Sequence, residues 1–175
     1  SDSPTDDESV SENAHLNLIN TASHYLYIMT PYLVIGFEME TALCIAAKSG
    51  IDVRIIVPGI PDKKYVYSVT RSNYERLTKN GVKIYEYTPG FVHGKVMVAD
   101  GKMAIIGTSN LDFRSYYLHF ECGALIVDSP CIEDVVTDYV DTLNKSQEIT
   151  YEMAIATPFL TRIYRAVMNV FAALF

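Results

Sequence analysis

One stretch of the chain decides both its fold and its candidate chemistry. Residues 91–115 read FVHGKVMVADGKMAIIGTSNLDFRS. Two runs rich in β-forming residues, at 93–99 and 102–106, are separated by the dipeptide Asp100-Gly101. Asp-Gly between two such runs favours a tight hairpin turn. The stretch therefore predicts a β-hairpin followed by a polar segment.

The open end of this hairpin would gather the groups that bind and attack a phosphate. His93 and Lys95 are two residues apart, so a strand would present them on one face while Val96 and Val98 point the other way, into a core. Thr108 and Asn110 follow the second strand and would return to the start of the first. Lysine supplies positive charge, and the hydroxyl and amide groups donate hydrogen bonds to phosphate oxygens. Histidine supplies a nucleophile or a proton donor near neutral pH.

Away from the hairpin, apolar spacing predicts alternating helices and strands. This alternation up to residue 87 favours an α/β domain with a largely parallel sheet. After residue 87 the expected strands follow one another without a helix between them. A capping-box spacing places the first helix start near Ser9. The expected helices cover residues 9–23, 37–47, 65–79 and 130–143, and the expected strands cover 25–29, 53–57, 82–87, 93–99, 102–106 and 120–127.

The two ends of the chain depart from this pattern. Residues 1–9 are acidic and polar, which predicts a linker, and the domain itself covers residues 10–150. Residues 151–175 are expected to form an amphipathic C-terminal tail, in which Arg162 and Arg165 belong to a narrow polar stripe. Such a helix would either lie at a membrane surface or pack on the domain, and its two arginines disfavour a membrane span.

Composition narrows the classes of function. The 175 residues fit one domain with a sizeable core, and the net charge of −7 makes nucleic acid an unexpected partner because phosphate backbones are repelled. The odd number of cysteines, none in a C-x-x-C spacing, predicts neither a disulfide framework nor a zinc site. No metal or other cofactor is expected. The chain opens without a signal peptide or a methionine, which suggests a piece of a longer protein.

The polar residues of the hairpin have the spacing H-x-K-x4-D-x6-G-[ST]-x-N, which resembles the motif of the phospholipase D superfamily. The motif is met at His93, Lys95, Asp100, Gly107, Thr108 and Asn110. The flanking segments YLYIMTPYL, ALCIAAKSGIDVRIIVPGIPDK and SNLDFRSYYLHFECG are similar to the C-terminal half of bacterial cardiolipin synthases, over roughly residues 1–128. The resemblance implies a phospholipase D-like α/β fold, with a mixed, mainly parallel sheet flanked by helices.

The resemblance also implies an activity. In this family a histidine attacks the phosphorus of phosphatidylglycerol, releases glycerol and forms a phosphatidyl-histidine, from which a second phosphatidylglycerol takes the phosphatidyl group to give cardiolipin. Two histidines from two motif copies act together. This chain would then be the second half of a two-motif phosphatidyltransferase and inactive alone. Its partner would be an upstream domain of the same protein or a homodimer mate.

The resemblance assigns a role to each site residue. His93 would be the nucleophile or the general acid, Lys95 and Asn110 would clamp phosphate, and Thr108 would assist them. Glu121 matches the family's glutamate that orients the histidine, since it lies 11 residues after Asn110. The expected location is the cytoplasmic side of a bacterial cell membrane, with membrane lipid as substrate and this fragment alone soluble.

Asp100 belongs to the motif but is expected to be structural. An extended strand would place it about 23 Å from His93, at a turn position that favours aspartate for local reasons. His15 and His24 are expected to be exposed near helix ends, and no pattern assigns a role to His119.

Two alternative functions stay open. One is a phospholipase D-type phosphodiesterase or nuclease that acts as a homodimer, against which the acidic net charge speaks. The other is a non-catalytic membrane-interaction module that keeps only the fold, against which the intact motif speaks.

Overall fold

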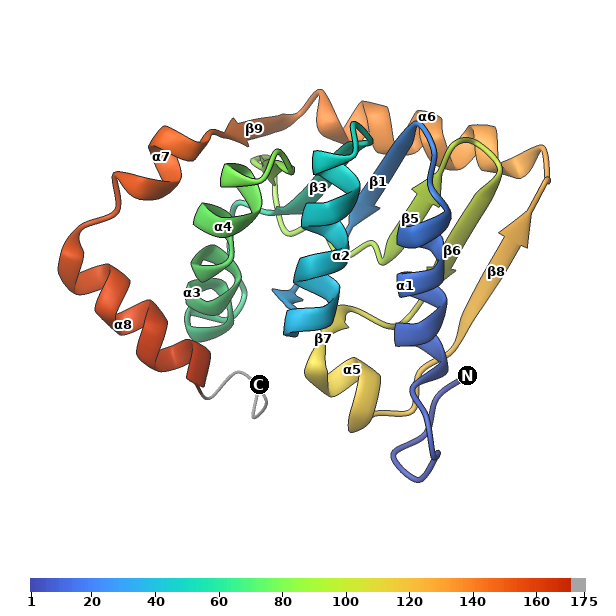
Figure 1. Ribbon diagram of the computed structural model, residues 1–175, viewed down its shortest axis with the longest axis horizontal. Coiled ribbons are helices and arrows are strands. Elements are labelled where there is room, and N and C mark those ends of the chain that lie inside the picture. Colours follow the sequence, from blue (N-terminus) through green and yellow to red (C-terminus); the bar gives the residue numbers. More distant parts are fainter. Residues whose placement is uncertain (171–175) are drawn as a thin grey trace.

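A computed structural model describes residues 1–170, in which a mixed seven-stranded sheet carries helices on both faces (Figure 1). The strand order is β8-β6-β5-β1-β3-β4-β9. The strands are β1 (Tyr25–Met29), β3 (Asp52–Pro58), β4 (Lys83–Tyr87), β5 (Val96–Ala99), β6 (Met103–Gly107), β8 (Gly123–Val127) and β9 (Ser146–Ile149). A separate parallel pair joins β2 (Leu33–Val34) to β7 (Leu111–Asp112).

Apolar side chains from the helices close a core on each face of this sheet. The helices are α1 (Val10–Thr21), α2 (Phe37–Lys48), α3 (Lys64–Ser72), α4 (Tyr74–Lys79), α5 (Phe113–Tyr117), α6 (Cys131–Leu143), α7 (Tyr151–Ile155) and α8 (Phe159–Val170). On one face, Leu18 of α1, Leu43 of α2 and Leu77 of α4 belong to the largest buried cluster. On the other face, Ile132 and Tyr139 of α6 pack on the sheet. The expected C-terminal tail forms α7 and α8, and residues 171–175 lie outside the described residues.

The expected α/β class with a mixed sheet flanked by helices is confirmed. Within this sheet parallel pairing joins only β1, β3 and β4, whereas β5, β6 and β8 pair antiparallel on one side and β9 on the other, so the sheet is mixed but not mainly parallel as expected. The reason is the connections: a helix separates each pair of central strands, while β5 and β6 are joined by a short turn that only antiparallel strands can use.

Two segments differ from the predicted elements. The expected helix at 65–79 is broken into α3 and α4 at Asn73, whose side chain donates a 2.9 Å hydrogen bond to the carbonyl of Leu33. Strands β5 and β8 also begin later than predicted, at Val96 and Gly123. The catalytic candidates ahead of them therefore lie in loops at the sheet edge.

Asp100 ties the β5–β6 turn to the start of β1. Its backbone has a positive φ of 56°, and its carboxylate accepts hydrogen bonds from the backbone N–H groups of Ser23 (2.7 Å), His24 (2.8 Å) and Tyr25 (2.9 Å). Burial works against the charged form, but these three donors outweigh it and lower the pKa of Asp100. These contacts are structural, and they lie at the opposite end of β5 from His93.

The N-terminal segment contacts the domain although it was expected to be a linker. Asp2 is buried, and its backbone pairs with that of Glu121 in both directions, at 2.9 and 3.2 Å. Its carboxylate accepts from the backbone N–H groups of Val10 (2.6 Å) and Ser11 (3.1 Å) at the start of α1. His15, expected to be exposed, is also buried, because the inner face of α1 packs on the domain.

Candidate active site

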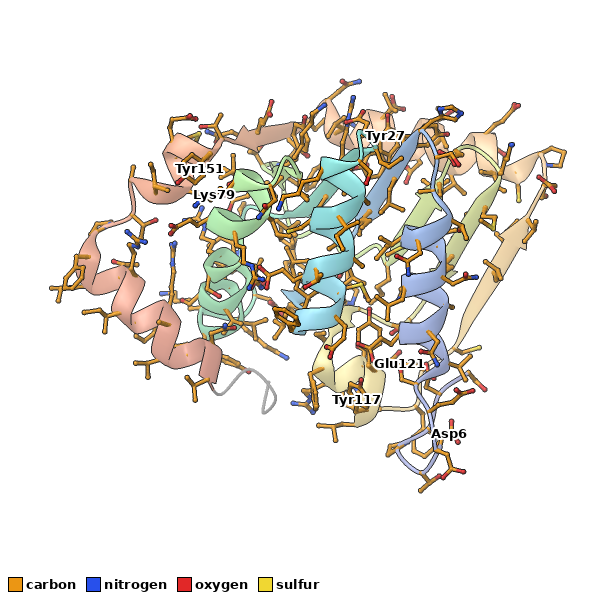
Figure 2. The ribbon with its side chains drawn as sticks, in the orientation of Figure 1. Asp6, Tyr27, Lys79, Tyr117, Glu121 and Tyr151 are labelled. Carbon is orange, nitrogen blue, oxygen red and sulfur yellow. The ribbon has the colours of Figure 1, made fainter. Side chains whose placement is uncertain are left out.

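The predicted site residues meet at one edge of the main sheet. His93 and Lys95 precede β5, Thr108 and Asn110 follow β6, and Glu121 precedes β8. Strand β6 lies between β5 and β8 and runs antiparallel to both. The start of β5, the end of β6 and the start of β8 therefore lie at the same edge. Glu121 is seen there beside α5 and the N-terminal segment (Figure 2).

A close approach of two backbones fixes the position of Thr108. A Cβ atom at Gly107 would lie 2.6 Å from the carbonyl oxygen of Cys122 and 2.7 Å from the Cα of Gly123, so only glycine fits there. The backbone N–H of Thr108 donates to the Cys122 carbonyl, and the Cys122 N–H donates to the Thr108 hydroxyl, both at 2.9 Å. The motif glycine thus allows the pairing that positions the hydroxyl.

Glu121 is 9% exposed, and its carboxylate has two polar side-chain partners. It accepts a hydrogen bond from the Thr108 hydroxyl, and one of its oxygens lies 3.7 Å from Nδ1 of His119. Within residues 1–170 no hydrogen bond or ion pair joins Glu121 to His93, the partner expected from sequence. His93 is exposed on the loop before β5, whereas Thr108 lies directly beside Glu121. The orienting role of Glu121 therefore stays a prediction.

His93 has an environment that favours its neutral form. Partial burial and the nearby Lys95 ammonium lower its pKa, and the carboxylate of Asp62 acts in the opposite direction. The imidazole ring lies 5.5 Å from the ring of Phe91. A neutral imidazole has the free lone pair that a nucleophile needs.

Lys95 places its ammonium group between His93 and the carboxylates of the site. Its Nζ donates a 2.9 Å hydrogen bond to the carbonyl oxygen of His93. Burial lowers its pKa, while the charges of Glu121 and Asp112 act to raise it. A cation held beside the candidate nucleophile would offset the negative charge of an incoming phosphate.

The amide group of Asn110 is fixed by its own neighbours. Nδ2 donates to Asp112 (3.1 Å) and to the hydroxyl of Ser115 (3.0 Å), and Oδ1 is buried without a hydrogen-bond partner among the described residues. In this orientation Asn110 offers a free acceptor rather than a free donor. The expected phosphate contact would require the oxygen and nitrogen ends of the amide to exchange places.

Three basic side chains outside the motif also reach this edge. A cavity of about 120 Å³ beside Asn110 is lined by Lys63, Arg114 and His119. Arg114 donates to Nε2 of His119 at 3.1 Å, so Nε2 accepts and the ring proton lies on Nδ1, which faces Glu121. Sequence reasoning assigned none of these residues to the site. The one available signal was that His119 and Glu121 are two apart, a spacing that places side chains on one side of an extended segment.

The residues of this edge form a set suited to phosphoryl transfer. Two imidazoles, three cationic side chains, a hydroxyl and two carboxylates meet there, which supplies a nucleophile, proton carriers and positive charge. Within residues 1–170, no group of three or more histidine, cysteine, aspartate or glutamate side chains is placed to hold a metal ion. None of the helices in that range is long and apolar enough to cross a bilayer.

Solved structures of phospholipase D type share this fold. Nuc from Salmonella typhimurium, described as a phospholipase D family member, matches with a TM-score of 0.72 at 18% identity, over 81% of this chain and 92% of that one. Phosphatidylserine synthase from Haemophilus influenzae Rd KW20 matches with a TM-score of 0.77 at 16% identity, over 96% of this chain and 46% of that one. The fold is therefore phospholipase D-like.

Sequence comparison identifies the family more specifically than the fold does. The family model described as the phospholipase D-like domain of cardiolipin synthase matches residues 15–145. A cardiolipin synthase from Geobacillus sp. (strain WCH70) is 39% identical over 94% of this chain and 33% of that protein, and an uncharacterized protein from Streptococcus mutans is 45% identical over 99% of this chain and 38% of that protein. The chain belongs to the cardiolipin synthase phospholipase D-like domain family, and it spans about a third of the length of these relatives.

Proposed function

We propose that this chain forms one half of the active site of a phosphatidyltransferase, which makes cardiolipin from two phosphatidylglycerol molecules. The observation that carries the proposal is His93, whose lowered pKa and neighbouring Lys95 suit attack on a phosphodiester, in a chain whose relatives include cardiolipin synthases. The reaction would take place at the cytoplasmic side of a bacterial cell membrane, where both substrates are lipids.

The proposed reaction has two balanced steps. In the first, a histidine nitrogen attacks phosphorus, the phosphorus–oxygen bond to glycerol breaks, and an acid protonates the leaving glycerol oxygen. In the second, a headgroup hydroxyl of another phosphatidylglycerol attacks phosphorus, the phosphorus–nitrogen bond breaks, and a base takes the hydroxyl proton. His93 would act as the nucleophile or as the acid, while Lys95 and Thr108 would stabilise charge on the phosphate oxygens.

The second catalytic imidazole would come from outside this motif. The chain carries one copy of the motif and covers about a third of its relatives' length. We expect an upstream domain of the same protein to carry the second copy, or a homodimer mate to supply it. Residues 10–150 would then be the phospholipase D-like half, and residues 151–175 its amphipathic extension.

A variant of the full-length protein tests the proposal. His93→Ala should abolish cardiolipin formation from phosphatidylglycerol vesicles, because the candidate nucleophile or acid is lost. EDTA should leave the wild type active, since Lys95 provides the positive charge. Lys102→Ala, an exposed change at the far turn, is the matched control and should retain activity. Full activity of His93→Ala would overturn the proposal. Loss with EDTA that a divalent cation restores would overturn its metal-free chemistry.

A further inference from the structure

Helix α8 lies along α3 and contacts the rest of the chain through one side (Figure 1). Met168 packs against Val66 and Val69 of α3. Near the start of the helix, Arg162 forms a 2.9 Å ion pair with Glu75. These contacts orient the helix, so its opposite side has a defined position.

That opposite side is apolar and exposed. Its residues recur at the spacing of one helical face, and their exposed fractions range from 46 to 79%. They are Phe159, Leu160, Ile163, Tyr164, Val167 and Val170. We call this set the α8 apolar face. A contiguous apolar surface of this kind marks a site of contact with another molecule or with a membrane.

A cavity of about 540 Å³ separates α8 from α3 and α7 and borders the α8 apolar face. Phe159 and Ile163 line the cavity and also belong to that face. The cationic lining consists of Arg71, Arg162 and Arg165. A ligand in this cavity would therefore meet positive charge inside and apolar side chains at the rim.

The three arginines differ in how their charge is balanced. Arg71 makes two hydrogen bonds to the Glu86 carboxylate, and Arg162 pairs with a glutamate of α4. Arg165 donates only to the hydroxyl of Thr157, at 3.1 Å, and within residues 1–170 it has no carboxylate partner. Burial and the neighbouring Arg71 lower the pKa of Arg165, while the Glu86 carboxylate acts to raise it. The guanidinium keeps donors available for an anion.

We propose that this cavity and the α8 apolar face form a binding site for an anionic phospholipid at a bilayer surface. The headgroup phosphate would bind Arg165, and the acyl chains would lie along Phe159 and Leu160. An amphiphile satisfies both the unpaired cation and the apolar face, whereas a free phosphate would leave that face uncovered. The choice of a lipid occupant rests on the proposed function, but no lining residue belongs to the candidate active site.

The site also explains how an acidic chain could approach an anionic membrane. The net charge of −7 opposes such binding over the molecule as a whole. A local cation beside an apolar helix face supplies attraction over a short range, and the arginines at the boundary can keep their charges at the headgroup level. Because α8 lies along α3, binding there would place the domain beside the bilayer without a membrane span.

Vesicle co-sedimentation tests this site without any turnover. The chain is mixed with vesicles of phosphatidylcholine alone, or of phosphatidylcholine and phosphatidylglycerol in equal parts. We expect binding to the mixed vesicles, about fivefold weaker for Arg165→Gln and about tenfold or more weaker for Phe159→Ser/Leu160→Ser. Lys102→Gln removes an exposed charge elsewhere and should bind normally. His93→Ala should also bind normally, which separates this site from failure of the proposed reaction.

Several results would overturn the inference. These are equal binding of Arg165→Gln and wild type, equal binding to vesicles with and without phosphatidylglycerol, and full competition by soluble glycerol phosphate, which would indicate a site for a free anion. Sedimentation in the absence of lipid tests one further outcome that would overturn the inference: a dimer that Phe159→Ser/Leu160→Ser dissociates would show that a second copy covers the α8 apolar face. Far-UV circular dichroism verifies that each variant is folded. Arg165→Lys keeps the charge and should retain part of the binding if the helix remains docked.

Discussion

His93 lies between a cation and a carboxylate whose effects on its pKa oppose each other. Partial burial and Lys95 favour the neutral ring, while Asp62 favours the charged ring. Asp62 also accepts a 2.5 Å hydrogen bond from the hydroxyl of Tyr32, so its position is held by a neighbour. The balance among these groups sets the pH range in which the His93 ring is neutral.

The first residue-scale prediction concerns this balance. Lys95→Met should raise the pKa of His93, because a neighbouring cation is removed, and Asp62→Asn should lower it further. NMR titration of the His93 ring in the chain measures both shifts. A lowered pKa leaves the ring neutral to lower pH. Asp62→Asn should therefore move the acid limb of the full-length protein's rate profile to lower pH if His93 is the nucleophile, and the alkaline limb to lower pH if His93 is the acid. A His93 titration that neither substitution moves would show that these charges do not set it.

At the scale of elements, the β5–β6 turn depends on Asp100. Asp100→Ala removes the acceptor for three backbone N–H groups and should lower the free energy of unfolding by about 1–3 kcal/mol. The lowered pKa of Asp100 means that its stabilisation is present at neutral pH and is lost as pH falls through the folded-state pKa, below the ordinary value for aspartate. Urea unfolding at several pH values measures both effects.

Asp100→Asn is the matched control for this turn. Asparagine tolerates the positive φ and keeps one acceptor oxygen, so its loss of stability should be smaller. If Asp100→Ala abolished activity in the full-length protein while leaving stability unchanged, the structural role of this motif residue would be wrong.

Local sequence signals predicted most elements within a few residues. Helices α1, α2 and α6 carry periodic apolar faces. Ser9 caps the start of α1, and its hydroxyl accepts from the backbone N–H of Glu12 as the capping spacing indicates. The break at Asn73 could not be predicted in this way, because its cause is a hydrogen bond to a residue 40 positions away. Strand β9 was missed for a similar reason, since among residues 1–170 it pairs with β4, which lies about 60 positions earlier in the chain.

In the candidate site, too, local sequence predicted some features, while others depend on contacts between distant residues. Motif spacing predicted which residues meet at the sheet edge, because strand pairing places both ends of the motif there. It could not predict that Glu121 would face Thr108 and His119, or that Arg114 would donate to His119, because those contacts depend on where β5 and β8 begin. Side-chain partners are thus less predictable here than the location of the site.

At the scale of the whole molecule, we expect the chain alone to turn over little or no phosphatidylglycerol as a monomer. The reaction requires one group to attack phosphorus and another to protonate the leaving alkoxide. Activity is measured with phosphatidylglycerol vesicles over a protein concentration series, with sedimentation in parallel. Activity that rises with the dimer fraction would indicate a site shared between two copies.

His119 provides the control for this expectation. It is the second imidazole of the same chain at the sheet edge, next to Glu121. If a species that sediments as a monomer were active, and His119→Asn removed that activity, the chain would supply both imidazoles itself. The two-motif mechanism would then be wrong for this protein.

The pairing of Asp2 with Glu121 makes the N-terminal segment part of the site's support. Asp2 caps the start of α1 and also forms the isolated β-bridge beside the strand that follows Glu121. Its neighbours up to Ser9 are mostly exposed polar residues, which a protease can reach more easily than the domain. A single cut in this segment would end the covalent connection between Asp2 and the domain, so that both contacts would depend on non-covalent bonds alone. Limited proteolysis in a cell could in this way loosen Glu121 without cleaving any residue of the candidate active site.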